Sequence, residues 1–121
     1  MNQFLYFAKT FIEKRKLTHL MKMYIMLKEA VPTKLAPVIA AHASLACYKK
    51  FEADARMVHW INSVFKKVVC KVSEEEFNQL KNEKDYVLLT ESALNNQEVC
   101  LAFCPREEYP KKFRFFKMWG P

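Results

Sequence analysis

The apolar residues at the start of the chain recur at steps of three and four positions. Phe4, Phe7 and Phe11 follow this spacing, and the segment then closes on the charged run Glu13-Lys14-Arg15-Lys16. Such spacing is typical of an amphipathic helix, and basic residues are favoured at a helix C-terminus by the helix dipole. The pattern therefore predicts a helix over roughly residues 2–19.

Short apolar runs further along the chain predict strands. The run Met23–Lys28 is almost continuously apolar and precedes the break at Pro32-Thr33, as is typical of a buried central strand. Three more runs predict strands, the first of them rich in β-branched residues: Lys66–Val72, Tyr86–Thr90 and Val99–Phe103.

Helical patterns separate these strands. Thr33 is expected to cap a long helix, with Pro37 in the first turn, where the missing N–H costs little. Six residues are expected to form the apolar face of this helix: Leu35, Val38, Ile39, His42, Leu45 and Ala46. A second helical piece is predicted over Glu52–Ile61, and Ser73 with Glu76 forms a capping box that opens a third.

This order of elements predicts a single α/β domain with a four-stranded mixed sheet flanked by helices. The first two strands are expected to be parallel, and the last two to form an antiparallel hairpin. At 121 residues the chain has room for one modest core. We expect the main domain to cover residues 22–105, with residues 1–21 as a helical extension and residues 106–121 as a basic, aromatic tail packed on or near it.

Composition narrows the chemistry that the chain can perform. The single glycine is Gly120, in the tail. Phosphate-binding loops, dinucleotide fingerprints and nucleophile elbows all need glycines inside the fold, so these classes of enzyme are excluded.

The charge indicates the kind of partner. The chain has 20 Lys and Arg residues against 13 Asp and Glu residues, a formal net charge of +7, which favours an anionic partner such as RNA. Lys28, Lys66 and Lys67 are candidate binding residues. Aromatic residues of the tail offer rings for stacking on unpaired bases, and the alternative is that they pack onto the sheet above a merely soluble basic surface.

The cysteine pattern favours a reduced protein. The four thiols belong to Cys47, Cys70, Cys100 and Cys104, and no secretory signal precedes them. We therefore expect a cytoplasmic chain that uses them as small core residues, with no metal and no cofactor. The longest nearly apolar run, Leu35–Tyr48, is too short to span a membrane, which takes about 20 residues.

Several short stretches share their order and spacing with one family. They are Ala40-Ala41-His42-Ala43, Ala46-Cys47-Tyr48-Lys49, Trp60, Lys67–Val72, Ser73-Glu74-Glu75 and Leu101–Pro105. Over about residues 22–105 the chain resembles the type 2 peptidyl-tRNA hydrolases. This resemblance implies a four-stranded mixed sheet flanked by helices, and cleavage of the ester between a stalled peptide and the tRNA ribose.

The active-site pattern that the resemblance implies is largely missing. Members of the family carry a Gly-Lys-Gly-Lys stretch at the entry to the first helix and a Gln three residues before the His-Ala pair. Here Leu35 stands in place of the second Lys, and Ile39 in place of the Gln. The family's Asp falls near Glu91, in a loop that has lost its glycine. Only His42 carries over, as a candidate binding residue or as a packed core histidine.

A rearranged site is the alternative to a lost one. Ester hydrolysis needs a base for water and donors aimed at the developing oxyanion, and the candidates are Lys34, Thr90, Glu91 and Ser92. Lys34 does not simply replace Leu35, because one residue turns a helical side chain by about 100°. We therefore favour a noncatalytic domain that binds RNA (tRNA) or a protein partner, a homodimer included. An active hydrolase with a rearranged site is the alternative.

Overall fold

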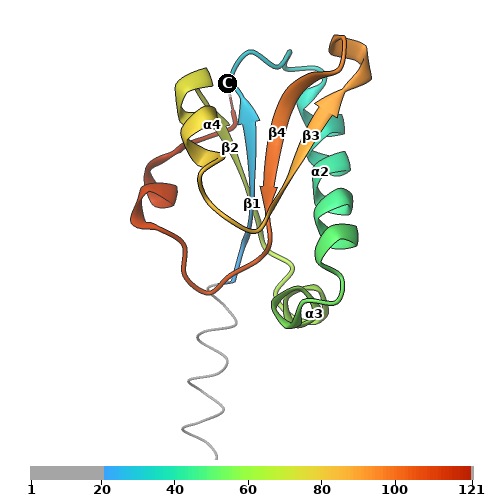
Figure 1. Ribbon diagram of the computed structural model, residues 1–121, viewed down its shortest axis with the longest axis vertical. Coiled ribbons are helices and arrows are strands. Elements are labelled where there is room, and N and C mark those ends of the chain that lie inside the picture. The colour runs from blue at the N-terminus through green and yellow to red at the C-terminus, as the bar shows by residue number, and fades with distance from the viewer. Residues whose placement is uncertain (1–20, 121) are drawn as a thin grey trace, which may run out of the picture.

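The computed structural model describes residues 21–120, in which a mixed sheet has helices on both faces (Figure 1). The elements in chain order are β1 (Met23–Lys28), α2 (Ala36–Phe51), α3 (Ala55–Asn62), β2 (Lys67–Val72), α4 (Glu74–Leu80), β3 (Tyr86–Glu91), η1 (Ser92–Leu94), β4 (Gln97–Phe103), η2 (Lys111–Phe115) and β5 (Lys117–Met118). The helix predicted over residues 2–19 lies outside the described residues.

The sheet has the strand order β3-β4-β1-β2-β5. The strands β1 and β2 are parallel, with Met23 opposite Lys67 and Lys28 opposite Val72, whereas β3 and β4 form an antiparallel hairpin. Both predicted pairings are therefore confirmed. The predicted number of strands is wrong, because β5 adds a fifth strand antiparallel to β2. A strand of two residues is too short to produce the alternation that marks strands in a sequence.

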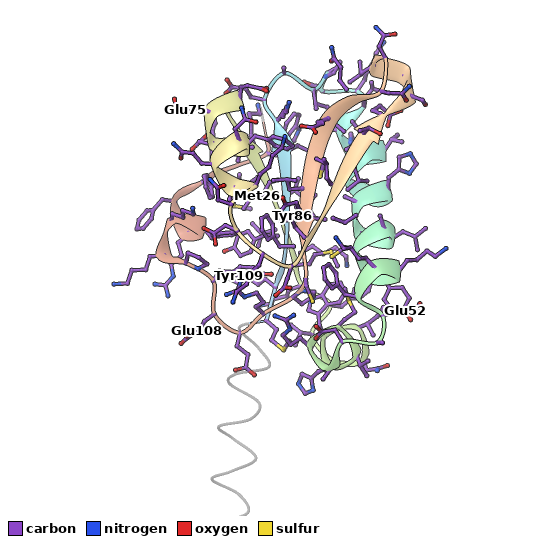
Figure 2. The ribbon with its side chains drawn as sticks, viewed as in Figure 1. Met26, Glu52, Glu75, Tyr86, Glu108 and Tyr109 are labelled. Atoms are coloured by element: carbon purple, nitrogen blue, oxygen red, sulfur yellow. The ribbon has the colours of Figure 1, made fainter. Side chains whose placement is uncertain are left out.

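Two apolar layers cover the two faces of the sheet. Alternate residues of β1 enter different layers: Ile25 packs beneath α2 and α3, and Met26 packs beneath α4 (Figure 2). Both side chains are fully buried. The central strand thus contacts apolar residues on both sides, which explains its unbroken apolar sequence.

The orientation of α2 differs from the prediction. Its buried residues are Ala36, Ile39, Ala43 and Cys47. Val38 and Leu45 are 48% and 63% exposed, and His42 is also exposed, so the predicted apolar face, and with it a packed core histidine, is wrong. The helix is apolar on most of its circumference, and the small Ala residues let its backbone lie close to the sheet.

The start of α2 also differs in part. The N-cap position belongs to Leu35, which makes no side-chain hydrogen bond, so the predicted Thr33 cap is wrong. Pro37 does lie in the first turn, as expected. By contrast, the predicted capping box of α4 is confirmed, because Ser73 Oγ accepts from the Glu76 N–H and Glu76 Oε1 accepts from the Ser73 N–H.

Three aromatic residues after β4, Tyr109, Phe113 and Phe116, pack against the α4 side of the sheet. Phe113 is 2% exposed, and its ring meets the rings of Tyr24 and Phe103 edge to face at 5.2 Å each. Tyr109 stacks on Phe113, and its hydroxyl lies 2.9 Å from the carbonyl oxygen of Lys22. These contacts pack Tyr109 and Phe113 onto the sheet.

Candidate functional site

A cavity of about 340 Å³ opens at the end of the sheet where β1 finishes. Its lining includes Lys28 at the end of β1, Glu74 at the start of α4, Leu94 in η1 and Glu98 near the start of β4. Figure 2 marks this end of the molecule by Glu75, the neighbour of Glu74. The cavity therefore collects side chains from elements that are far apart in the sequence.

Lys28 is held between a carboxylate and an aromatic ring. Its Nζ donates to Glu74 Oε1 at 3.0 Å and lies 4.6 Å from the centre of the Phe77 ring. The capping box of α4 fixes the helix start that carries Glu74. Because the Glu74 side chain is 67% exposed, solvent weakens the ion pair, and an anionic ligand can compete for the ammonium group.

A second ion pair lies beside the first. Lys81 Nζ donates to Glu98 and lies 5.4 Å from the centre of the Phe77 ring. Two ammonium groups therefore contact one buried ring, and each has a carboxylate partner. A ligand that binds these ammonium groups must therefore compete with Glu74 and Glu98 for them.

The four predicted catalytic residues lie at this same end of the sheet. Thr90 and Glu91 end β3, which runs in the same direction as β1, and Lys34 lies in the connection from β1 to α2. None of the four lines the cavity. Glu91 Oε1 accepts from the Ala93 N–H at 3.2 Å, and no hydrogen bond or ion pair joins it to Lys34 within residues 21–120.

Residues 21–108 match the family model described as peptidyl-tRNA hydrolase PTH2. The chain belongs to this family. The match covers all of the strands from β1 to β4 and confirms the resemblance inferred from the sequence. No curated protein and no solved structure matches the chain significantly.

Two residues that replace polar groups of the PTH2 family pattern pack against the core. Ile39, in the place of the Gln, is 1% exposed, and Leu35, in the place of the Lys, is half-buried against the same cluster. His42, which does match the pattern, lies on the exposed side of α2. The side chains of Ile39 and Leu35 offer no hydrogen-bond donor and no base.

The predicted binding lysines do not form one site. Lys28 contributes to the cavity, whereas Lys66 and Lys67 lie at the opposite end of the sheet, because Lys67 pairs with Met23 at the start of β1. The length of one strand, about 16 Å, separates Lys28 from Lys67 along the sheet.

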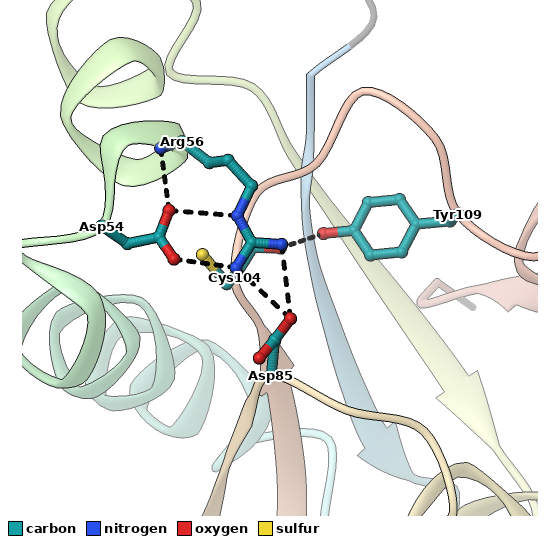
Figure 3. Close-up of polar contacts among 5 residues, drawn as sticks. All are labelled: Asp54, Arg56, Asp85, Cys104 and Tyr109. Atoms are coloured by element: carbon teal, nitrogen blue, oxygen red, sulfur yellow. Dashed lines mark hydrogen bonds and ion pairs between the residues drawn. The ribbon is translucent and has the colours of Figure 1, made fainter.

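A cluster that sequence reasoning missed joins α3 to the sheet (Figure 3). Arg56 Nη2 lies 2.8 Å from Asp54 Oδ2 and 3.3 Å from Asp85 Oδ2, and Arg56 Nε donates to Asp54 Oδ1. Asp54 is also the N-cap of α3, a position at which Asp is a recognisable helix-start signal. Because both carboxylates hold the guanidinium, it is not available for a phosphate.

The thiols are not suited to catalysis. All four cysteines are buried and free, which confirms the prediction of small core residues. Burial raises the pKa of Cys104, next to the Arg56 cluster, to about 11 and that of Cys47 to about 12, so these thiols stay protonated at neutral pH.

Two negative findings concern the described residues alone. Within residues 21–120 no group of three or more His, Cys, Asp or Glu side chains is arranged to hold a metal ion. No helix in that same part of the chain is both long enough and apolar enough to cross a membrane.

Proposed function

We propose that this member of the PTH2 family is a noncatalytic domain that binds RNA, with tRNA as the RNA that family membership suggests. The observation that carries the loss of catalysis is the burial of Ile39. Its side chain lies in the core with Ala43 and Cys47, facing the sheet. A Gln there would bury an amide, at a cost of about 1–3 kcal/mol if unpaired.

The remaining candidate groups do not supply a replacement. Glu91, nearest to the family's Asp, uses its carboxylate to accept the Ala93 N–H and so holds the turn of η1. A general base must be free to accept a proton from water within hydrogen-bond reach of the substrate. Two positions of the family pattern are thus apolar, and one oxygen of the Glu91 carboxylate is engaged in the turn.

The surface charge supports an anionic partner. Several lysines are exposed and, within residues 21–120, take part in no ion pair: Lys49, Lys84, Lys111 and Lys117. Together with the net charge of +7, they favour the release of counterions from a polyphosphate chain. Affinity for RNA is then expected to fall steeply with salt.

Two assays on the full-length chain test this function. In the first, peptidyl-tRNA is incubated with the protein, and we expect no release of peptide above the spontaneous rate. In the second, labelled tRNA is titrated over a salt series, and we expect the logarithm of the association constant to fall linearly with the logarithm of the salt concentration. Enzymatic release of peptide would contradict the noncatalytic assignment, and the absence of a tRNA complex at low salt would contradict RNA binding.

The placement of Lys34, Thr90, Glu91 and Ser92 at one end of the sheet favours the second candidate, an active hydrolase with a rearranged site. If the first assay detects release, Lys34→Ala and Glu91→Ala are each expected to reduce turnover by orders of magnitude. Turnover equal to that of the unmodified protein in both variants would exclude this set of residues.

A further inference from the structure

Phe65 occupies a backbone conformation that bulky residues rarely adopt. It follows α3, where its N–H donates to the carbonyl oxygen of Trp60 at 3.0 Å, and its φ of 59° lies in the left-handed region. Glycine is the usual residue in such a position after a helix. Despite its apolar ring, Phe65 is 56% exposed. The backbone conformation therefore does not account for a phenyl ring here, and more than half of the ring's residue stays open to solvent.

The contacts of this ring leave one face open. Phe65 stacks on the buried Trp60, with ring centres 5.2 Å apart and planes at 27°. Lys67 Nζ lies 3.2 Å from the centre of the Phe65 ring and 5.0 Å from that of Trp60, so it lies on the Trp60 side of the Phe65 ring. The outer face of Phe65 is thus the exposed one, and a cation beneath the ring supports it.

A second lysine of β2 also contacts an aromatic ring. Lys71 Nζ lies 4.7 Å from the centre of the half-buried Trp119 ring. Lys67, Val69 and Lys71 alternate along β2 and so project from one face of the sheet. The two lysines are about 13 Å apart along the strand. We call Phe65, Lys67, Lys71 and Trp119 the β2 platform.

The chemistry of the β2 platform fits one class of ligand. Aromatic faces stack on unpaired bases whatever their sequence, and positive charges along a surface follow the phosphate backbone. Partial burial of the Lys67 ammonium group lowers its pKa. Asp and Glu side chains of an acidic peptide would engage the lysines, but these side chains have no ring to stack on Phe65.

We propose that the β2 platform binds single-stranded RNA, with a base stacked on the outer face of Phe65 and phosphates on Lys67 and Lys71. This inference rests on the proposed RNA-binding function and assigns that function to the β2 platform. Phe65 and Lys67 lie at the opposite end of β1 and β2 from the candidate cavity, whereas Lys71 pairs with Leu27, the neighbour of the cavity residue Lys28. Binding there needs none of the residues that the family pattern has lost.

Fluorescence anisotropy of the full-length chain with labelled oligouridine tests the proposal. The variant Phe65→Gly removes the ring and is compatible with the left-handed backbone, so we expect no loss in Tm. Its affinity for oligouridine is expected to be about tenfold lower, which corresponds to about 1.4 kcal/mol. An abasic oligomer of the same charge is expected to bind the variant and the unmodified protein equally.

Two further variants separate stacking from charge. Phe115 is 83% exposed in η2, and Phe113 of the same element packs on the other face of the sheet, so Phe115→Ala is a matched control with unchanged affinity. Lys67→Gln is expected to lower the slope of log affinity against log salt by about 0.7, the value for one phosphate of a single strand.

Each remaining outcome decides between the two proposals. If oligouridine binds but Phe65→Gly binds it as tightly as the unmodified protein does, the β2 platform is wrong and RNA binding stands. An equal loss of affinity for the abasic oligomer excludes base stacking. If neither oligouridine nor tRNA binds at low salt, both the platform and the proposed function are wrong.

Discussion

Arg56 contacts two carboxylates that come from different parts of the chain. Asp54 begins α3, and Asp85 lies just before β3, with a φ of 63°. The backbone N–H of Cys104 donates to the carbonyl oxygen of Asp85 at 2.8 Å. One guanidinium thereby fixes α3 against the residues where β3 begins and β4 ends.

This cluster predicts a dependence of stability on pH. The hydrogen bond from Arg56 holds the pKa of the Asp54 carboxyl below its usual value. A carboxyl group whose pKa is lower in the folded state stabilises that state above its unfolded pKa, near 3.9, and loses this effect as the pH falls through the folded pKa. The difference in free energy of unfolding between the unmodified protein and Asp54→Asn is therefore expected to shrink below about pH 4.

Urea unfolding from pH 2 to pH 7 measures this difference. Asn is as good an N-cap as Asp, so Asp54→Asn removes the charge and keeps the cap. A difference that stays constant over the whole range would contradict the role assigned to the ion pair. Because the Asp54 and Arg56 side chains are 28% and 37% exposed, solvent limits the effect to about 1 kcal/mol.

At the scale of elements, α2 shows what the sequence determines and what it leaves open. Its existence, its Pro37 and its partner strands follow from local patterns. Its rotation does not, because apolar residues occur on both its buried and its exposed sides, Ile39 on one and Val38 on the other. Packing of small residues against the sheet decides between them, and that information is not local.

The rotation of α2 predicts that the same substitution at two neighbouring positions lowers stability strongly at one and hardly at the other. Ile39→Gln places an amide in the core and is expected to lower the free energy of unfolding by about 3 kcal/mol. Val38→Gln lies on the exposed side and is expected to change it by less than about 0.5 kcal/mol. Urea unfolding measures both. Similar losses in the two variants would mean that the helix is rotated as the sequence pattern suggested.

The strands could be predicted from the sequence, whereas most contacts of the candidate site could not. The first four strands and the capping box at Ser73 were predictable, because each depends on residues close in sequence. The two predicted pairings followed from the order of the elements. The pairing of Lys28 with Glu74, and the Arg56 cluster, join residues 46 and 29 positions apart. Only the folded chain brings such groups together. The strand β5 was not predicted because two residues are too short to show a strand pattern.

At the scale of the whole molecule, residues after β4 complete one of the two apolar layers. Phe113 contacts Tyr24 of β1 and Phe103 of β4, and Phe116 adds a further ring at 5.9 Å from Phe113. The main domain expected over residues 22–105 would leave this layer open to water. Burial of such aromatic rings contributes about 1.5–3 kcal/mol each.

Truncation tests this dependence. A chain that ends at residue 105 is expected to lose its cooperative thermal transition, because it exposes the rings of Tyr24 and Phe103. A chain that ends at residue 116 keeps the aromatic contacts of Phe113 and lacks β5 and Trp119, so it is expected to retain the transition at a lower Tm. Circular dichroism during heating measures both. A cooperative transition in the shorter chain would show that the α4 layer is stable without these residues.

The shortness of β5 has a consequence for solubility. It pairs with Cys70 and Lys71 alone, and Trp119 reaches Val69 through one hydrogen bond, so the first two residues of β2 border no further strand within residues 21–120. Exposed strand edges promote edge-to-edge aggregation, and lysines on them oppose it. Positive charge at Lys67 thus keeps two copies of this edge apart. Neutralising that charge is expected to lower solubility and to promote self-association.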